Sequence, residues 1–208
     1  MIPTSCPWLS LVTNAGFTGM TGKQSKCPPS GAHHHLLDRR KHGRLSSNIK
    51  TMLIAFFDID GLAHHEFVPT GQTVNKEFFK TVLQRLLDAV RRHHPENWRF
   101  GNWILHHDNA PAHRAVTTNE FLAKHNILSL PQPPYSPDLV PCDFLFPQLK
   151  KTMKGRRFDY VEHIHANAMR QLRAITKSDY QRCFHQWQEC WNKCIQAQGH
   201  YFEGDKTN

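Results

Sequence analysis

The hydrophobic pattern becomes regular at Lys50, and it begins with two strands. Met52 to Phe57 is a short apolar run with aromatic content, which is typical of a buried strand. Asp60-Gly61 follows and predicts a two-residue hairpin turn, because both positions tolerate positive φ. Leu62 to Val68 then predicts the returning strand. The ordered part of the chain is therefore expected to open with an antiparallel hairpin.

The next segment has the period of an amphipathic helix. Thr73 or Asn75 can cap this helix, and Glu77 lies in its first turn. The helix is expected to end before Pro95, because the residue before a proline disfavours helical geometry. Its apolar positions recur every three or four residues, and they are Phe79, Val82, Leu83, Leu86 and Val90.

Two short strands then enclose another helix. Trp103 to His107 predicts a strand that delivers Asp108 at its C-terminal end, and Pro111 suits the first position of a helix. Residues 112–124 predict that helix, and Ile127 to Leu130 predicts the second strand. Strand, helix and strand in this order are typical of a βαβ unit.

A proline-rich loop leads into three C-terminal helices. Proline fixes φ and favours extended geometry in the preceding residue, so Pro131 to Pro141 predicts a stiff loop. Asp143 is expected to open a helix through about Met153, where a carboxylate suits the helix dipole. Two more helices carry apolar stripes that we assign to the core: Val161, Ile164, Ala168, Leu172 and Ile175 in the first, and Tyr180, Phe184, Trp187, Trp191 and Ile195 in the second, which Gly199 is expected to cap.

Residues 1–48 differ from the rest of the chain. They are rich in Gly, Ser, Pro, His and basic residues, and Asp38 is their first acidic residue. We interpret residues 1–48 as a poorly ordered basic arm with a short strand at Trp8 to Val12, and residues 49–208 as the folded domain. The element order predicts an α/β fold with a mixed sheet flanked by helices.

Composition narrows the class of partner. The 208 residues suit one domain, and their formal charge of +9 favours nucleic acid over a membrane surface, although a merely soluble basic protein remains an alternative. No apolar run approaches the ~18 residues of a membrane span. Without a Cys-x-x-Cys pair or a secretory signal, reduced thiols in an intracellular protein are expected. The six cysteines are Cys6, Cys27, Cys142, Cys183, Cys190 and Cys194.

Asp108 and Asp143 are the candidate catalytic and metal-binding residues. Two-metal phosphoryl transfer needs carboxylates that converge from different elements on divalent ions about 3.5–4 Å apart. A strand end and a helix start joined by a stiff loop can bring two carboxylates together. The alternative is that both residues merely cap helices, and residue types alone favour that alternative.

Six ordered motifs between about Asn48 and Asp205 change this balance: Phe57-Asp58-Ile59-Asp60-Gly61, Pro69 to Asn75, His106 to His113, Tyr135 to Asp143, Lys154 to Phe158 and Tyr201 to Gly204. Together they resemble the catalytic domain of the mariner family of DNA transposases. The resemblance implies an RNase H-like fold and cut-and-paste DNA transposition with Mg²⁺ or Mn²⁺. It also implies that Asp108 and Asp143 are the second and third catalytic carboxylates, whereas Asp138 belongs to a loop signature outside the metal triad.

The chain departs from the family where the first carboxylate belongs. The family's Thr-Gly-Asp-Glu word points to Val12 to Gly19, which contains no acid. We therefore expect Asp108 and Asp143 to bind one ion weakly or none. Asp58 and Asp60 are not expected to substitute, because other strands at about 4.8 Å each separate their hairpin from the Asp108 strand. The family's N-terminal helix-turn-helix half is also missing, so specific recognition of transposon ends is expected to be lost.

Three other groups of residues are candidates for a functional role. A basic cluster after Asp143 is a candidate for DNA phosphate contacts that position DNA without reading sequence, with a solvated face as the alternative: Lys150, Lys151, Lys154, Arg156 and Arg157. Adjacent histidines on a strand point to opposite faces, so neighbouring histidines are not expected to share a metal site. A capping or surface role is expected for His113. Cys183, Cys190 and Cys194 share the last helix, but a zinc site needs four ligands and no fourth is evident. Half-buried free thiols are therefore expected there.

The sequence therefore predicts a transposase-derived domain that binds DNA nonspecifically and whose metal-dependent cleavage and strand transfer are defective. The alternatives are a catalytically dead DNA-associated module and a translated transposon relic without function. We expect a monomer, because the segments that usually support dimerisation in the family are missing. Nuclear localisation is expected from Arg39-Arg40-Lys41 and the DNA partner.

Overall fold

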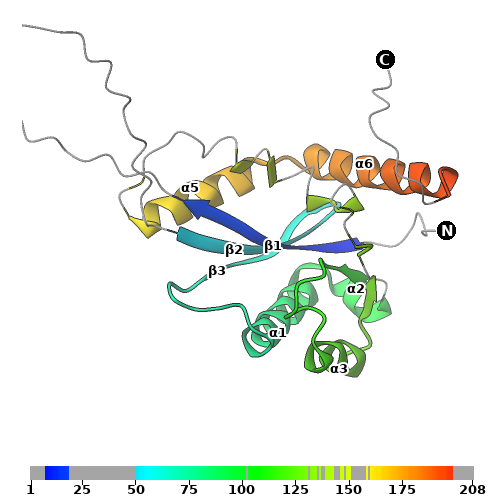
Figure 1. The fold of residues 1–208 in the computed structure, drawn as a ribbon, viewed down its shortest axis with the longest axis horizontal. Helices are drawn as coiled ribbons and strands as arrows, with labels where there is room; N and C mark the ends of the chain where they lie inside the picture. The colour runs from blue at the N-terminus through cyan, green and yellow to red at the C-terminus, as the bar shows by residue number, and fades with distance from the viewer. Residues whose placement is uncertain are drawn as a thin grey trace, which may run out of the picture.

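A five-stranded mixed sheet lies between two helical layers in the computed structural model (Figure 1). Helices α1, α2 and α3 lie on one side of the sheet, and α5 and α6 on the other (Figure 1). The structure describes residues 8–18, 50–101, 103–130, 132–134, 136, 139–142, 146–147, 149–150, 158 and 160–198, with only the backbone for residues 8–18 and 50.

The strand order in the sheet is β3-β2-β1-β4-β5. The strands are β1 (Trp8–Thr18), β2 (Lys50–Asp58), β3 (Gly61–Val68), β4 (Ile104–His106) and β5 (Leu128–Leu130). Strand β2 pairs antiparallel with both β1 and β3, whereas β4 pairs parallel with β1 and β5. The predicted hairpin and the predicted βαβ unit are thus both confirmed, and β1 joins them.

Strand β2 is buried on both faces, which explains its unbroken run of apolar residues. Leu53, Ala55 and Phe57 belong to the core on the side of α5 and α6. Ile54 and Phe56 belong to the second core, to which α1 and α3 contribute. Because successive side chains of a strand point to opposite faces, one short strand serves both cores.

Five helices cover the sheet in the part of the chain that the structure describes. They are α1 (Lys76–His93), α2 (Pro95–Phe100), α3 (Val116–Lys124), α5 (Val161–Ala174) and α6 (Lys177–Gln196). Asn75 caps α1 as predicted, with its side chain accepting the Phe78 amide, and Thr176 caps α6 in a capping box with Asp179. The apolar stripe of α1 is buried as expected. Helices α5 and α6 each bury three of their five predicted stripe residues, but Ile195 is 62% exposed, so its assignment to the core is wrong.

The N-terminal prediction is partly wrong. The short strand expected at Trp8 to Val12 continues to Thr18, although Asn14 and Gly16 are poor strand formers. Pairing with β2 along its length holds this segment extended, with an irregularity between Val12 and Ala15. The rest of residues 1–48 lies outside the described residues, so the division at residue 48 stays a prediction.

Three local predictions differ from the structure. The hairpin turn is Ile59-Asp60 rather than Asp60-Gly61, because the Asp58 carboxylate accepts the amides of Asp60 and Gly61 and leaves positive φ to Gly61 alone. Pro111 lies in a turn, and α3 begins only at Val116. Helix α6 ends at Gln196, with Ala197 rather than Gly199 as its cap.

Helix α2 was not predicted. It has no buried residue, so it carries no hydrophobic period, and Pro95 starts it at the position where a proline is tolerated. No helix in the described residues is long and apolar enough to cross a membrane. The helix predicted after Asp143 is seen only in part, at residues 146–147 and 149–150, because Asp143 itself lies outside the described residues.

Glu66 ties the edge strand β3 to α1. Both of its carboxylate oxygens accept from Arg85, at 2.7 Å from Nε and 2.6 Å from Nη2, and Oε1 also contacts His64 at 2.7 Å. Burial raises the pKa of Glu66, but the hydrogen bonds to His64 and Arg85 outweigh burial and lower the pKa to about 2. The ionised carboxylate therefore stabilises the folded state.

Glu66→Gln is expected to lower the free energy of unfolding at pH 7 by about 1–2 kcal/mol, a value reduced for the exposure of Arg85. Because the folded-state pKa of about 2 lies below the ordinary value of 4.5, this stability is present above pH 4.5 and is lost as pH falls toward 2. Denaturant titrations between pH 3 and 7 measure the difference, with the exposed Glu120→Gln as control. An equal loss at all pH values would contradict the ionic account.

Candidate functional site

Asp108 lies where the sequence predicted it, just beyond the C-terminal end of β4. Its Oδ1 accepts a hydrogen bond from the Ala110 amide at 3.0 Å and one from Nδ1 of His113 at 2.6 Å. The side chain is still 40% exposed. Asp108 therefore caps the turn at residues 110–113 rather than a helix, and it keeps contact with solvent.

His113 holds Asp108 from inside the domain. Its side chain is only 1% exposed, and its ring packs against Phe79 of α1 with 4.1 Å between centroids. Because Nδ1 faces a carboxylate, Nδ1 carries the proton and donates it. The capping or surface role expected for His113 is therefore wrong: the residue is buried and orients the candidate catalytic carboxylate.

A buried polar network fixes the β4 end next to Asp108. His106 contacts Gln132 Oε1 through Nε2 at 2.9 Å, and Asn109 donates to the Gln132 carbonyl at 2.8 Å. His107 bonds the Asp108 carbonyl through Nδ1 and Ser129 through Nε2. Burial lowers the pKa of His106 to about 4 and lowers the pKa of His107, so both rings are neutral at pH 7.

Gln132 was missed by the sequence reasoning. It belongs to the proline-rich loop, and its side chain bridges from His106 to the Ser136 carbonyl at 2.6 Å. A glutamine between prolines carries no signal of this role, because the contact spans 26 positions along the chain. The loop is thus attached to the Asp108 segment through a buried amide.

The neighbouring strand brings no carboxylate to Asp108. Strand β1 pairs parallel with β4, with Ser10 opposite His106, and its sequence Trp8–Thr18 contains neither Asp nor Glu. The strand that should carry the family's first carboxylate is therefore present without it. Asp143 and Asp138 lie outside the described residues, so the pairing of Asp108 with Asp143 stays a prediction.

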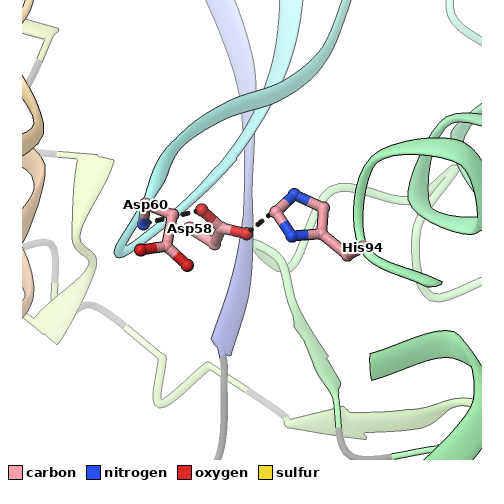
Figure 2. A group of neighbouring side chains, drawn as sticks. All are labelled: Asp58, Asp60 and His94. Atoms are coloured by element: carbon pink, nitrogen blue, oxygen red, sulfur yellow. Dashed lines mark hydrogen bonds and ion pairs between the residues drawn. The ribbon is translucent and has the colours of Figure 1, made fainter. Parts of the chain in front are cut away.

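Asp58 and Asp60 cannot replace the missing carboxylate. Strand β1 lies between β2 and β4, so these two strands are about 10 Å apart across the sheet. Phe57 and His106 both face Ser10, and β2 runs opposite to β4, so Asp58 and Asp108 diverge by about 10 Å more along the strands. Asp58 instead meets His94 from the junction of α1 and α2, at 3.3 Å (Figure 2).

The other candidate groups are only partly described. Lys150 is exposed on a helical turn, while Lys151, Lys154, Arg156 and Arg157 lie outside the described residues. Cys190 and Cys194 are half-buried, as expected. Cys183 is more deeply buried than expected: it donates to the Pro141 carbonyl at 2.8 Å, and burial raises its pKa to about 12.

Comparison with known proteins identifies what this arrangement resembles. The family model described as DDE superfamily endonuclease matches residues 25–165. The mariner Mos1 transposase of Drosophila mauritiana is 33% identical over 156 residues, which are 74% of this chain and 45% of that protein. The histone-lysine N-methyltransferase SETMAR of Homo sapiens is 30% identical over 156 residues, 74% of this chain and 23% of that protein.

Solved structures agree with the sequence comparisons. The Mos1 catalytic domain with raltegravir and Mg matches with a TM-score of 0.69 and 35% identity, over 74% of this chain and 78% of that one. A pre-cleavage Mos1 transpososome matches with a TM-score of 0.76 and 28% identity, over 94% and 57%. The predicted RNase H-like α/β fold is thereby confirmed. The chain spans less than half the length of the two curated relatives.

His113→Phe is expected to preserve the packing against Phe79 while removing the hydrogen bond to Asp108. Because Asp108 keeps access to water, the free energy of unfolding should fall by only about 1 kcal/mol. Chemical denaturation at pH 7 measures the change, with His125→Phe beside Phe121 as the matched control. A loss above about 3 kcal/mol would contradict this account, because one hydrogen bond to a half-exposed carboxylate contributes less than that.

Proposed function

Because the chain belongs to the DDE superfamily endonucleases, we propose that it is a mariner transposase-derived DNA-binding domain whose metal-dependent cleavage is defective. One observation carries the proposal. Strand β1 lies between β2 and β4 in the sheet but contains no acidic residue, whereas the adjacent β4 delivers Asp108. The scaffold of the site is kept and one of its three carboxylates is not.

The residues present suit a divalent ion only in part. Mg²⁺ and Mn²⁺ prefer hard oxygen ligands, and the half-exposed carboxylate of Asp108 offers one. Mos1 catalytic-domain structures contain Mg or Mn, ions that in such sites activate the attacking and leaving oxygens of phosphodiesters. Without a carboxylate from β1, the donor set is too small for two ions. We infer at most one weakly held ion, at Asp108 with Asp143.

DNA binding follows from charge and from likeness. The chain carries a formal charge of +9, and Lys150 is exposed on the helix that follows the proline-rich loop. Several Mos1 relatives are described in complexes with transposon ends. Phosphate contacts by lysine and arginine position DNA without reading sequence. We therefore propose nonspecific, salt-sensitive binding of DNA by a nuclear, monomeric protein.

A catalytically dead DNA-associated module is the second candidate. The hydrogen bonds that His113 and the Ala110 amide give to Asp108 favour it, because they satisfy Oδ1 without a metal ion. A functionless relic is less well supported, since β1 pairs with strands on both of its edges. The activity tests below separate the dead module from a residual nuclease.

Asp108→Asn is expected to leave nicking of supercoiled plasmid unchanged, because the parent chain should already be near background with Mn²⁺. Both proteins, and the exposed control Asp88→Asn, should shift DNA equally on a gel at low salt. Nicking by the parent and by Asp88→Asn, but not by Asp108→Asn, would overturn the proposed defect. Absence of any gel shift would overturn the DNA-binding proposal.

Ala15→Asp is expected to restore part of the activity. Aligning the family's Thr-Gly-Asp-Glu word on Thr13 places its Asp at Ala15, and β1 is the strand next to β4. Mn²⁺-dependent nicking should rise at least about 10-fold over the parent, a modest part of what metal catalysis supplies. Thr18→Asp adds the same charge at the last residue of β1, three positions beyond Ala15, as a control. Equal rates for all three proteins, with intact folds, would show that the missing carboxylate is not the sole defect.

A further inference from the structure

A second group of possible metal ligands lies at the β2–β3 turn, away from Asp108. Ligand atoms of Asp58, Asp60 and His94 all lie within 4.8 Å of one another. Figure 2 shows Asp58 and Asp60 at the hairpin turn and His94 at the junction between α1 and α2, with the carboxylate of Asp58 between Asp60 and His94. Asp58 is buried, His94 is partly buried and Asp60 is exposed.

The geometry of Asp58 leaves one oxygen for an ion. Oδ1 accepts the amides of Asp60 and Gly61 at 2.8 and 3.0 Å, which fixes the rotamer. Oδ2 then faces Nε2 of His94 at 3.3 Å, which is long for a charged hydrogen bond. Two ligand atoms bonded to one tetrahedral zinc ion at about 2.0–2.2 Å lie about 3.4 Å apart. The observed separation therefore suits an ion between the two atoms.

A buried hydroxyl beside the same turn supplies an independent indication. Tyr180 is 2% exposed, and its hydroxyl has no hydrogen-bond partner among the described residues. The Tyr180 ring atom Cε2, next to the hydroxyl-bearing carbon, lies 3.9 Å from an ideal Cβ built on Gly61. Leaving a buried hydroxyl unpaired destabilises the folded state, so a polar partner is expected there. A metal-bound water is such a partner.

We propose that Asp58, Asp60 and His94 bind Zn²⁺, with water as the fourth ligand toward Tyr180. One imidazole and two carboxylates are a donor set that suits zinc, whereas Mg²⁺ takes oxygen ligands. Lys177 now pairs with Asp60, at 2.8 Å between Nζ and Oδ1, but its side chain is largely exposed and can swing into solvent. In the proposed site a doubly charged ion takes the place of the Lys177 ammonium beside Asp60.

The site would link the end of α1 to the β2–β3 turn, because His94 caps α1 while Asp58 and Asp60 lie at that turn. An ion that binds only the folded chain raises stability by mass action. This site is separate from the proposed nuclease site, because β1 lies between β2 and β4 and the two groups diverge along the strands.

The test counts zinc sites, because sixteen histidines and six cysteines offer other, unrelated ligands. The metal-free full chain is titrated with Zn²⁺ by calorimetry, and Co²⁺ spectra report the ligand type. His94→Gln and Asp60→Asn should each lose one binding equivalent relative to the parent. The exposed neighbour His93→Gln should lose none. Lys177→Gln should tighten the site by up to about 5-fold, the range of an exposed ion pair.

Equal stoichiometry in the parent, His94→Gln and His93→Gln would overturn the proposal. A Co²⁺ difference spectrum between the parent and His94→Gln that carries thiolate charge-transfer bands would also overturn it, since the proposed site contains no sulfur. Circular dichroism of each metal-free variant checks the fold. Should His94→Gln fail to fold, Asp60→Asn carries the same test, because that carboxylate is exposed.

Discussion

The pairing of β1 with strands on both sides is the constraint on which the rest of the domain depends. In the sheet order β3-β2-β1-β4-β5, β1 alone connects the antiparallel hairpin to the parallel pair. Both cores rest on that connection, because β2 contributes to each of them and β4 supplies buried Leu105. Selection on folding therefore retains β1 as a strand whatever its side chains do chemically.

This constraint is compatible with a nuclease scaffold that keeps its fold when a catalytic side chain is absent. Strand pairing uses backbone groups, so replacing an acidic side chain in β1 leaves the sheet intact. Asp108 has a structural role of its own, because its carboxylate accepts hydrogen bonds from the Ala110 amide and from Nδ1 of His113. An acidic side chain in β1 can thus be absent without loss of the fold, which is the basis of the proposed defect in metal-dependent cleavage.

Much of the fold was predictable because its elements carry local signals. The apolar run of β2, the helical period of α1 and the cap at Asn75 can each be recognised from a short stretch of sequence. The second half of β1 and helix α2 do not, since pairing with β2 holds one extended and the other buries no residue. Asp108 was found from its place at a strand end, whereas His113 and Gln132 act through contacts that no local pattern encodes.

Electron paramagnetic resonance of the full chain with Mn²⁺ and DNA tests the central claim most directly. Two manganese ions about 3.5–4 Å apart in a complete two-metal site would give an exchange-coupled signal. The account predicts only uncoupled, weakly bound Mn²⁺, because β1 offers no carboxylate to bridge two ions. A coupled pair that disappears in Asp108→Asn would contradict the account, since another residue would then supply the missing ligand.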